Sequence, residues 1–465
     1  MPEKYHIEVK PTSPRWTPVG KISAIEKDGC FGCARCAKKS CVYDIYRNRK
    51  FDSKQMCDTI DYLCKMCFRC VQECKGRILS RAVNPEFLQL GDQYWKPNII
   101  ATIWYQAETG KIPVSGAGYR GPFSGPGFDS MWTDMSEIVR PTRDGIHGRE
   151  YISTSIDLGR KLVRLEFAKD NSLISMPPPI LDIPMPIIFN PFPWGKINKN
   201  VRLALTNAGF SLGIPMIIES EEYFDELRPY DSIIMPQFTP KSFETHKNIL
   251  KRVRLCEFIY EDSIMNYVSK AKEINPQVIV SIRVKLNKEA EVVAQQLTQE
   301  GAEIIHLYAD YQGKEYEEAS PRFIKDAIRK VHLRLVEMQM RDEVTIIASG
   351  GIGLAEHLAK IIICGADGAG IDLPLLIALE CRLCKRCTNN LSCPVEMENI
   401  DTKWATQRMI NLIGAWHSQL IEVMGAMGIR EARRLRGEVG RAMFFEDVEK
   451  ETFGQLFGGR QKDGK

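Results

Sequence analysis

The sequence has little excess charge and no long uninterrupted apolar run. Its formal net charge is only +4 over 465 residues, which gives no general attraction to nucleic acid. The most apolar late segment, residues 361–381, is interrupted by Asp367 and Asp372, so we interpret it as buried strand and helix rather than a membrane span. The opening residues, MPEKYHIEVKPTSP, lack the apolar core of a signal peptide. We therefore expect a cytoplasmic protein with neither a nucleic-acid partner nor a membrane span.

Cysteine, by contrast, is abundant, with 15 residues in the chain. The reducing cytoplasm excludes a disulfide framework, so clustered cysteines indicate metal or redox use. Nine of them lie between residues 30 and 74, and four lie between 381 and 393. Cys256 and Cys364 are isolated, and we expect them to be small buried hydrophobic residues. The length and the 44% hydrophobic content predict more than one folded unit.

The amino-terminal cysteines form two runs, C-x2-C-x2-C-x4-C and C-x2-C-x2-C-x3-C. Three thiolates at this spacing can hold three corners of one iron-sulfur cubane, while the fourth cysteine reaches the other cubane. Zinc sites use the same thiolates but rarely need this triple spacing. Cys57 lies outside both runs and is not a predicted ligand. The predicted 4Fe-4S ligands are Cys30, Cys33, Cys36 and Cys74 for the first cluster, and Cys64, Cys67, Cys70 and Cys41 for the second.

From Cys30 to Cys74 this pattern resembles bacterial two-cluster ferredoxins. Lys75 and Val42 stand where that family usually has proline, and the first run is one residue longer, which bears on loop shape more than on ligation. The resemblance implies a small α+β ferredoxin-like unit, to which we assign residues 1–90, and an electron-transfer role for it.

A connecting segment, residues 91–182, is rich in glycine, proline and tryptophan and shows little sustained periodicity. We expect it to pack on the following domain. Gly116, Gly118 and Gly121 satisfy the dinucleotide pattern G-x-G-x-x-G, but Pro122 and the next glycines prevent a helix from opening there. The sequence therefore predicts no nicotinamide site in this chain.

Residues 183–380 alternate short apolar strands with amphipathic helices. In one interval, residues 287–301, Ala290, Val293, Ala294 and Leu297 recur at helical spacing before a stop at Gly301. This alternation predicts a (β/α)8 barrel, with a doubly wound sheet as the structural alternative. The eight strand candidates are MPIIFNP, IPMIIES, DSIIMPQ, CEFIYED, QVIVSIRV, EIIHLYA, VTIIASGG and GADGAGID.

Glycine runs follow the seventh and eighth strand candidates, where such barrels bind phosphate through backbone N–H groups. Tight turns also need glycine, but this position favours a phosphate ester, with FMN as the first candidate cofactor. On VIVSIRVKL, Arg283 and Lys285 share one face. If that face points into the barrel, the anionic edge of a reduced flavin would balance the two cations; a basic strand end reaching solvent is the alternative. The predicted FMN contacts are Asn190, Gln237, Arg283, Lys285, Ser349, Gly350, Gly351, Gly368 and Gly370.

Lys285 is the single candidate for catalysis, and the catalytic acid is unassigned. We interpret His147 and His306 as hydrogen-bonded structural residues rather than acid catalysts.

A second cysteine segment, residues 381–400, follows the barrel directly and begins CRLCKRCTNNLSCPV. A metal cluster beside a flavin can deliver electrons singly, so we predict a third iron-sulfur cluster on Cys381, Cys384, Cys387 and Cys393. The run resembles the cluster segment in the FMN-binding synthase domain of glutamate synthase, where three cysteines bind a 3Fe-4S cluster. Here CTNNLSCPV has one extra residue and Cys384 is added. The type of the third cluster therefore stays open: it is either a 3Fe-4S cluster on three of these cysteines or a 4Fe-4S cluster on all four.

The resemblance to glutamate synthase covers residues 95–440 and includes part of a helical carboxyl-terminal region, 401–465. With a ferredoxin unit ahead, it is similar to the archaeal-type arrangement. It implies an oxidoreductase whose reduced FMN passes a hydride to 2-iminoglutarate, supplied with electrons by ferredoxin or another redox partner protein, in association with other subunits.

Two departures bear on that activity. This chain shows no amidotransferase domain, and the family's loop after strand six, G-G-T-G-A-S-P, is here DYQGKEYEEASP, residues 310–321. The bulky and acidic residues of this loop are expected to close space near the flavin and to disfavour a dicarboxylate. The alternatives are an electron-transfer subunit without chemistry of its own and a zinc-stabilised structural protein.

Overall fold

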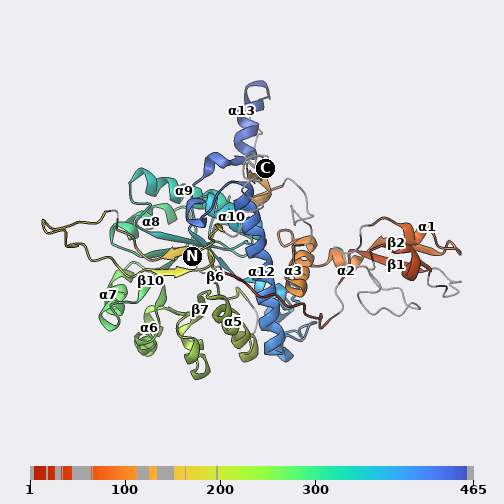
Figure 1. The fold of residues 1–465 in the computed structure, drawn as a ribbon, viewed down its shortest axis with the longest axis horizontal. Coiled ribbons are helices and arrows are strands. Elements are labelled where there is room, and N and C mark those ends of the chain that lie inside the picture. Colours follow the sequence, from red (N-terminus) through yellow and green to blue (C-terminus); the bar gives the residue numbers. More distant parts are fainter. Residues whose placement is uncertain are drawn as a thin grey trace.

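The computed structural model describes residues 5–16, 19–26, 33, 35–43, 64, 66–112, 125–133, 151–162, 164–194 and 197–457. A barrel forms the main body (Figure 1). A small unit extends from one side of it and is built around β1 (Ile22–Glu26), β2 (Leu79–Val83) and α1 (Arg69–Gln72). The long helix α12 (Thr402–Ala426) stands between the barrel and that unit.

Eight parallel strands close the barrel in the order β10-β11-β12-β13-β6-β7-β8-β9. Each strand predicted from the sequence is present, so the (β/α)8 fold is confirmed and the doubly wound sheet is excluded. Strands β6, β12 and β13 are buried at every position, because helices cover one side and the barrel interior the other. The strands are β6 (Ile187–Phe189), β7 (Met216–Glu219), β8 (Ile234–Phe238), β9 (Leu255–Ile259), β10 (Ile279–Lys285), β11 (Ile304–Tyr308), β12 (Thr345–Ser349) and β13 (Gly368–Ile371).

Helices follow the barrel strands along the chain and surround the sheet (Figure 1). The predicted helix between the fifth and sixth strands is α8, and Gly301 follows it with φ +97°, in the left-handed region that favours glycine. The barrel helices are α5 (Lys199–Leu212), α6 (Pro240–His246), α7 (Ile264–Ile274), α8 (Ala290–Gln299), α9 (Ile324–Glu337), α10 (Ala355–Ile363) and α11 (Leu373–Ala378).

The segment expected to be a plain connection contains a 13-residue helix, α3 (Pro97–Thr109), which packs on α11 and α12. Pro97 begins it and Gly110, with φ +68°, ends it. Two short sheets follow, β3 (Met131–Thr133) with β14 (Ala442–Phe444), and β4 (Ile156–Leu158) with β5 (Leu181–Ile183). The carboxyl-terminal region, expected to be helical, therefore also supplies a strand before its last helix, α13 (Phe445–Phe457).

The small amino-terminal unit pairs β1 (Ile22–Glu26) with β2 (Leu79–Val83) in antiparallel register. Between them in the chain lie a short π-helix, η1 (Cys36–Ser40), and α1 (Arg69–Gln72), which contact each other. Helix α2 (Pro85–Leu88) leads from this unit toward the barrel.

Ahead of this unit, residues 5–16 run along the barrel body as an extended strap. The Asn411 side chain on α12 accepts the Lys10 N–H at 3.0 Å and donates to the Lys10 carbonyl at 2.7 Å. Gly414 makes the close approach possible, because a Cβ there would lie 2.5 Å from a Val9 methyl carbon. Among the described residues, no helix is both long enough and apolar enough to span a bilayer.

Candidate active site

Inward-facing polar side chains from neighbouring strands converge on one buried carboxylate, Glu257 on β9. Its two oxygens accept hydrogen bonds from His306 Nδ1 at 2.6 Å, Gln237 Nε2 at 2.7 Å and the Ser281 hydroxyl at 3.2 Å. Arg283 Nη1 adds an ion pair at 3.3 Å. Burial alone raises the pKa of Glu257, but these partners outweigh it and hold the pKa at about 2. The barrel interior therefore contains a fully paired carboxylate.

His306 continues this network toward the barrel mouth. Burial lowers its pKa, so the ring is neutral. Nδ1–H donates to Glu257, and Nε2 accepts the Ser349 hydroxyl at 2.8 Å. His306 is hydrogen-bonded on both ring nitrogens and connects the interior to the end of β12.

Arg283 is a cation close to the barrel mouth. Its Nη1 donates to Asn190 Oδ1 at 2.7 Å, and the guanidinium lies 4.6 Å from the centre of the Tyr308 ring. Asp372, directly after β13, is buried, and burial raises its pKa to about 6. Its carboxylate accepts the Leu373 N–H and a hydrogen bond from Asn190. The Arg283 guanidinium and the Asp372 carboxyl group, whose pKa is about 6, therefore both lie at the barrel mouth.

The glycine run after β12 forms a buried concave turn. Gly350 and Gly351 have φ +104° and +69°, and Cβ atoms there would lie 2.5 Å from the Asp310 carbonyl oxygen and 2.7 Å from Gly313 Cα. Within the described part of the chain, no acceptor takes the N–H groups of Gly350, Gly351 and Ile352. Successive N–H groups in such a turn form an anion-binding concavity. The residues present therefore fit the phosphate of FMN.

The two glycines predicted on the eighth strand lie in different places. Gly370 faces the mouth residues, since a Cβ there would lie 2.9 Å from Ser349 Cβ and 3.5 Å from Asn190 Cγ. Gly368 lies at the start of β13, against the Ile156 side chain and the Pro186 carbonyl. The structure therefore groups Gly370 with Asn190, Gln237, Arg283 and Ser349, and leaves Gly368 outside this group.

The altered loop, residues 310–321, connects β11 to α9 and contacts the end of β10 beside the mouth. Tyr316 donates its N–H to the Leu286 carbonyl at 2.8 Å, and its ring packs on Tyr308 at 5.5 Å. Burial raises the pKa of Tyr316 to about 12, with nearby Asp310 and Asp372 contributing. Tyr316 therefore takes up space beside the ends of β10 and β11, and the effect of the loop on a substrate stays a prediction.

Each glutamate of this loop has a basic partner. Glu317 pairs with Lys285 at 3.4 Å. Glu318 pairs with Lys288 at 2.5 Å, and Glu315 pairs with Arg322 at 2.5 Å. The loop therefore adds less uncompensated negative charge than its sequence indicates. Lys285 itself is half exposed and held by this pairing.

The third cysteine set surrounds a cavity beside the barrel. Cys381, Cys387 and Cys393 line a space of about 150 Å³ together with Trp194 and Met397. Cys384 is exposed and is not among the lining residues.

Lys385 anchors this cysteine segment to the loop after β11. Its Nζ donates to the Tyr311 hydroxyl at 2.6 Å and lies 5.0 Å from the centre of the Trp194 ring. Because Tyr311 belongs to the loop that borders the mouth, the cysteine cavity and the mouth lie on the same side of the barrel.

Among the described residues, no three cysteine sulfurs lie within 4.8 Å of one another. Tetrahedral zinc with Zn–S bonds of about 2.3 Å brings its sulfurs within roughly 4 Å of one another. Across the described ranges, one group of three potential metal ligands has its ligand atoms within 4.8 Å of one another. It consists of Asp129, Glu356 and His357 and contains no cysteine.

Seven of the eight predicted amino-terminal cluster ligands are among the described residues, and Cys30 lies outside them. Cys57, His147 and the G-x-G-x-x-G run also lie outside the described residues. Backbone N–H groups, that of Ile78 foremost, lower the pKa of Cys74. Arg81 Nη2 donates to Cys70 Sγ at 3.6 Å. Such N–H···S contacts stabilise thiolates that bind iron.

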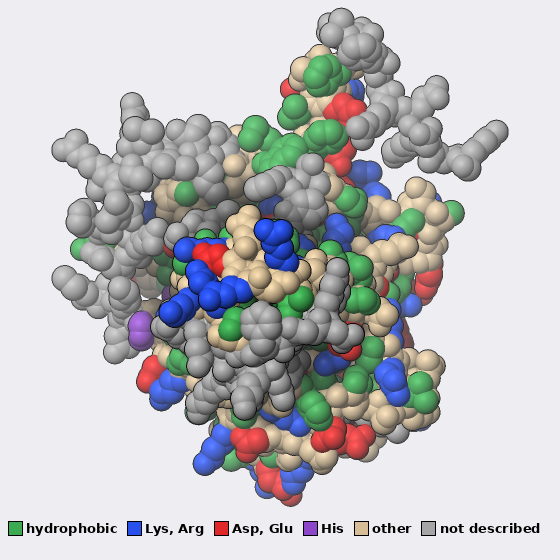
Figure 2. All heavy atoms as spheres, turned by 90° about the vertical axis from the view of Figure 1, so that its right-hand side faces the viewer, with side chains coloured by type: hydrophobic (Ala, Val, Ile, Leu, Met, Phe, Trp, Pro, Cys, Tyr) green, Lys and Arg blue, Asp and Glu red, His purple; other side chains and the backbone are tan. Residues whose placement is uncertain are grey.

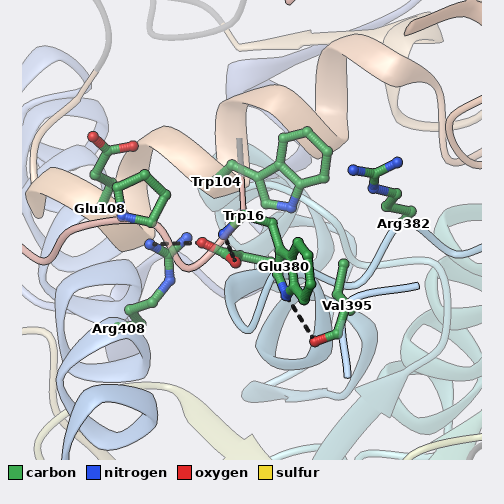
Figure 3. Close-up of a pocket in the computed structure, with 8 residues that line it drawn as sticks. Trp16, Trp104, Glu108, Glu380, Arg382, Val395 and Arg408 are labelled. Atoms are coloured by element: carbon green, nitrogen blue, oxygen red, sulfur yellow. Dashed lines mark hydrogen bonds and ion pairs between the residues drawn. The ribbon is translucent and has the colours of Figure 1, made fainter. Parts of the chain in front are cut away.

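The strap and the cysteine segment meet at a small pocket next to α12 (Figure 3). The Glu380 carboxylate accepts the N–H groups of Arg15 and Trp16 at 3.0 and 3.2 Å. Trp16 Nε1 donates to the Val395 carbonyl at 3.1 Å. On the other side, the Gly91 N–H donates to the Arg382 carbonyl at 3.2 Å. The chain on both sides of the amino-terminal unit is therefore fastened beside the third cysteine set.

The described residues therefore form a (β/α)8 barrel with a tight glycine turn at its mouth and an adjoining cysteine-lined cavity. The conserved region in glutamate synthase matches residues 243–430. Over this region the chain is therefore similar to glutamate synthases.

Curated relatives extend this likeness over most of the chain. It is 24% identical to an archaeal glutamate synthase [NADPH] of Archaeoglobus fulgidus, over 92% of this chain and 95% of that protein. It is 25% identical to the archaeal glutamate synthase [NADPH] of Methanocaldococcus jannaschii, over 95% of each chain. A crystal structure of mandelate oxidase aligns with a TM-score of 0.39 and 11% identity, covering 66% of this chain and 97% of that one.

Proposed function

We propose that this chain is an iron-sulfur flavoprotein that carries electrons from two amino-terminal cubanes, through a third cluster, to FMN at the barrel mouth. An imine-type substrate such as 2-iminoglutarate is then reduced there. The carrying observation is that three buried N–H groups, which no acceptor among the described residues takes, lie on the same side of the barrel as the cysteine cavity. The likeness to archaeal-type glutamate synthases supports the reaction class.

The proposed cofactor contacts follow from the mouth geometry. The N–H groups of Gly350, Gly351 and Ile352 would hold the phosphate, and Arg283 would offset negative charge on the ring. FMN, when bound, supplies hydride transfer. Asp372, with its pKa near 6, is the proposed proton donor to substrate, because it can hold a proton at neutral pH.

The proposed cluster ligands are the three cysteine sets named from the sequence. Cys30, Cys33, Cys36 and Cys74 would bind the first cubane, and Cys41, Cys64, Cys67 and Cys70 the second. In the third set, Cys381, Cys387 and Cys393 would hold the cluster from inside the cavity, and Cys384 would supply an exposed corner. We assign residues 1–90 to electron entry, 183–380 to the flavin barrel and 381–400 to the cluster between them.

A direct test is reduction of the anaerobic protein with a low-potential donor, followed by addition of 2-oxoglutarate and ammonia. Reoxidation of the flavin would support the glutamate-forming reaction. Asp372→Asn is the matched variant, because it keeps the side-chain shape and cannot donate a carboxyl proton. We expect it to retain flavin and to slow reoxidation at least tenfold. A reducible flavin that no imine reoxidises would exclude this reaction.

A second candidate function is that of an electron-transfer subunit without small-molecule chemistry. The observation that favours it is the loop at the mouth, where Tyr316 takes up space and Glu317 holds Lys285. This alternative predicts stable co-purification with a partner oxidoreductase. A purified chain that turns over an imine on its own would rule it out.

A further inference from the structure

The described part of the amino-terminal unit carries a strong local excess of basic residues. Residues 22–26, 33, 35–43, 64 and 66–83 contain seven Lys and Arg against two acidic residues, Glu26 and Glu73. Glu73 is itself paired with Arg69 at 2.7 Å and with Arg35 at 3.6 Å. This excess contrasts with the net charge of +4 for all 465 residues.

The basic side chains gather on the outer end of the molecule. Figure 2 shows Lys and Arg together on this face. We call the surface formed by the following five exposed residues the basic surface: Arg35, Lys39, Arg69, Lys75 and Arg77.

Exposed apolar side chains accompany the basic surface. Met66 and Phe68 are 41% and 46% exposed and flank Cys67, which is also exposed. Both have left-handed backbone, with φ of 52° and 56°, a conformation that non-glycine residues adopt at a cost and that clusters at functional sites. Val42 and Tyr43, which follow Cys41, are 55% and 42% exposed. Apolar side chains beside charged ones are typical of protein interfaces.

We propose that the basic surface docks an acidic one-electron carrier protein that reduces the amino-terminal cubanes. This inference rests on the proposed function, because it requires clusters on the cysteines beside the surface. At each docking the carrier loses one electron and a cluster gains one, so reduction of a two-electron substrate needs two dockings. Cys33 and Cys67 are exposed. Clusters bound to them would lie near the protein surface, which would shorten the distance that an electron crosses from the carrier.

Charge complementarity selects a protein of opposite sign. Opposite charges raise association rates by about 10- to 1000-fold at low ionic strength, and salt removes the gain. The exposed apolar residues would then bury against the carrier once it has docked, in the manner of a small transient interface.

The test measures reduction of the anaerobic protein by a reduced, acidic 2Fe-2S ferredoxin in a stopped-flow instrument, at low and high salt. The charge-reversal variant is Lys39→Glu with Lys75→Glu, because both side chains are exposed. The matched control is Lys330→Glu, an exposed lysine on α9 of the barrel. Dithionite reduction and iron content check that the clusters are intact.

We expect the double variant to lose at least tenfold in second-order rate at low salt and to lose most of the salt dependence. The control and the dithionite reaction should match the wild type. Equal rates for wild type and double variant, or a salt-independent wild type, would overturn the docking proposal. A protein that neither contains iron nor bleaches with dithionite would instead refute the proposed function.

Discussion

Individual cysteines in the third set differ in their surroundings, and this difference predicts the behaviour of the cluster. Cys393 lines the cavity and Cys384 is exposed outside it. We expect Cys384→Ala to keep a three-iron cluster and to lose about one iron per chain, whereas Cys393→Ala should lose the whole third cluster, about four irons. Iron analysis and low-temperature EPR of oxidised samples would measure both. If Cys384→Ala also loses the whole cluster, three cysteines do not suffice.

Glu257 is the residue on which the barrel interior depends most. Its pKa of about 2 lies below the ordinary 4.5, so its ionised form stabilises the fold above pH 4.5, and this stabilisation disappears as the pH falls toward 2. Glu257→Gln removes the charge beside Arg283 and should cost about 3 kcal/mol at pH 7. Urea unfolding between pH 7 and pH 3 would show the difference from wild type shrinking with acidity.

A matched control for that measurement is Glu226→Gln, an exposed partner of Lys199. It should leave the free energy of unfolding unchanged within the error of the measurement at any pH. A Glu257 variant that behaves like this control would contradict the assignment of a paired, buried carboxylate.

The sequence pointed to several of these residues but not to their partners. Arg283 stood out by its alternation with apolar neighbours, and the structure supplies its partners, Asn190 and Glu257. Glu257 itself lies in an apolar strand with no motif around it, and Asp372 looked like an interruption of an apolar run. Their importance arises from contacts between strands that are far apart in sequence, which local patterns do not contain.

Among the elements, the glycine turn after β12 makes the sharpest prediction. Gly351→Ala places a Cβ 2.7 Å from Gly313 Cα at φ +69°. Strain and displacement of the facing loop should cost about 2 kcal/mol or more. They should also weaken FMN retention, measured as flavin bound per chain after desalting.

Gly301→Ala offers an internal comparison for the glycine turn. Gly301 also has positive φ, +97°, but nothing lies within 4 Å of a Cβ there. Its variant should show about 1 kcal/mol of backbone strain and normal flavin content. Equal flavin loss in both variants would mean that the turn after β12 does not bind the cofactor.

Elements whose residues follow one dominant hydrophobic pattern could be predicted from the sequence. Elements that lie among glycines and prolines, or that pair with a distant segment, could not. All eight barrel strands are made mostly of apolar residues, because both sides of a parallel barrel are covered. Helix α3 was missed although Pro97 and Gly110 bracket it, since nearby glycines and prolines suggested irregular chain. Strand β14 was missed because its pairing with β3 joins residues more than 300 positions apart.

At the scale of the whole molecule, the order of the parts supports a path for electrons. The strap fastens at Glu380 and the return chain fastens at Arg382, so both connections to the amino-terminal unit pass beside the third cysteine set. The loop after β11 then joins that set to the mouth through Tyr311. The basic surface belongs to the amino-terminal unit, which extends to one side of the barrel body (Figure 1).

Iron, sulfide and flavin analysis of one anaerobically purified sample tests the central claim most directly. Three four-iron clusters and one cofactor predict about twelve irons, about twelve sulfides and one FMN per chain, in a brown protein that dithionite bleaches. A colourless sample, or one that contains zinc in place of iron and releases no flavin on denaturation, would contradict the account.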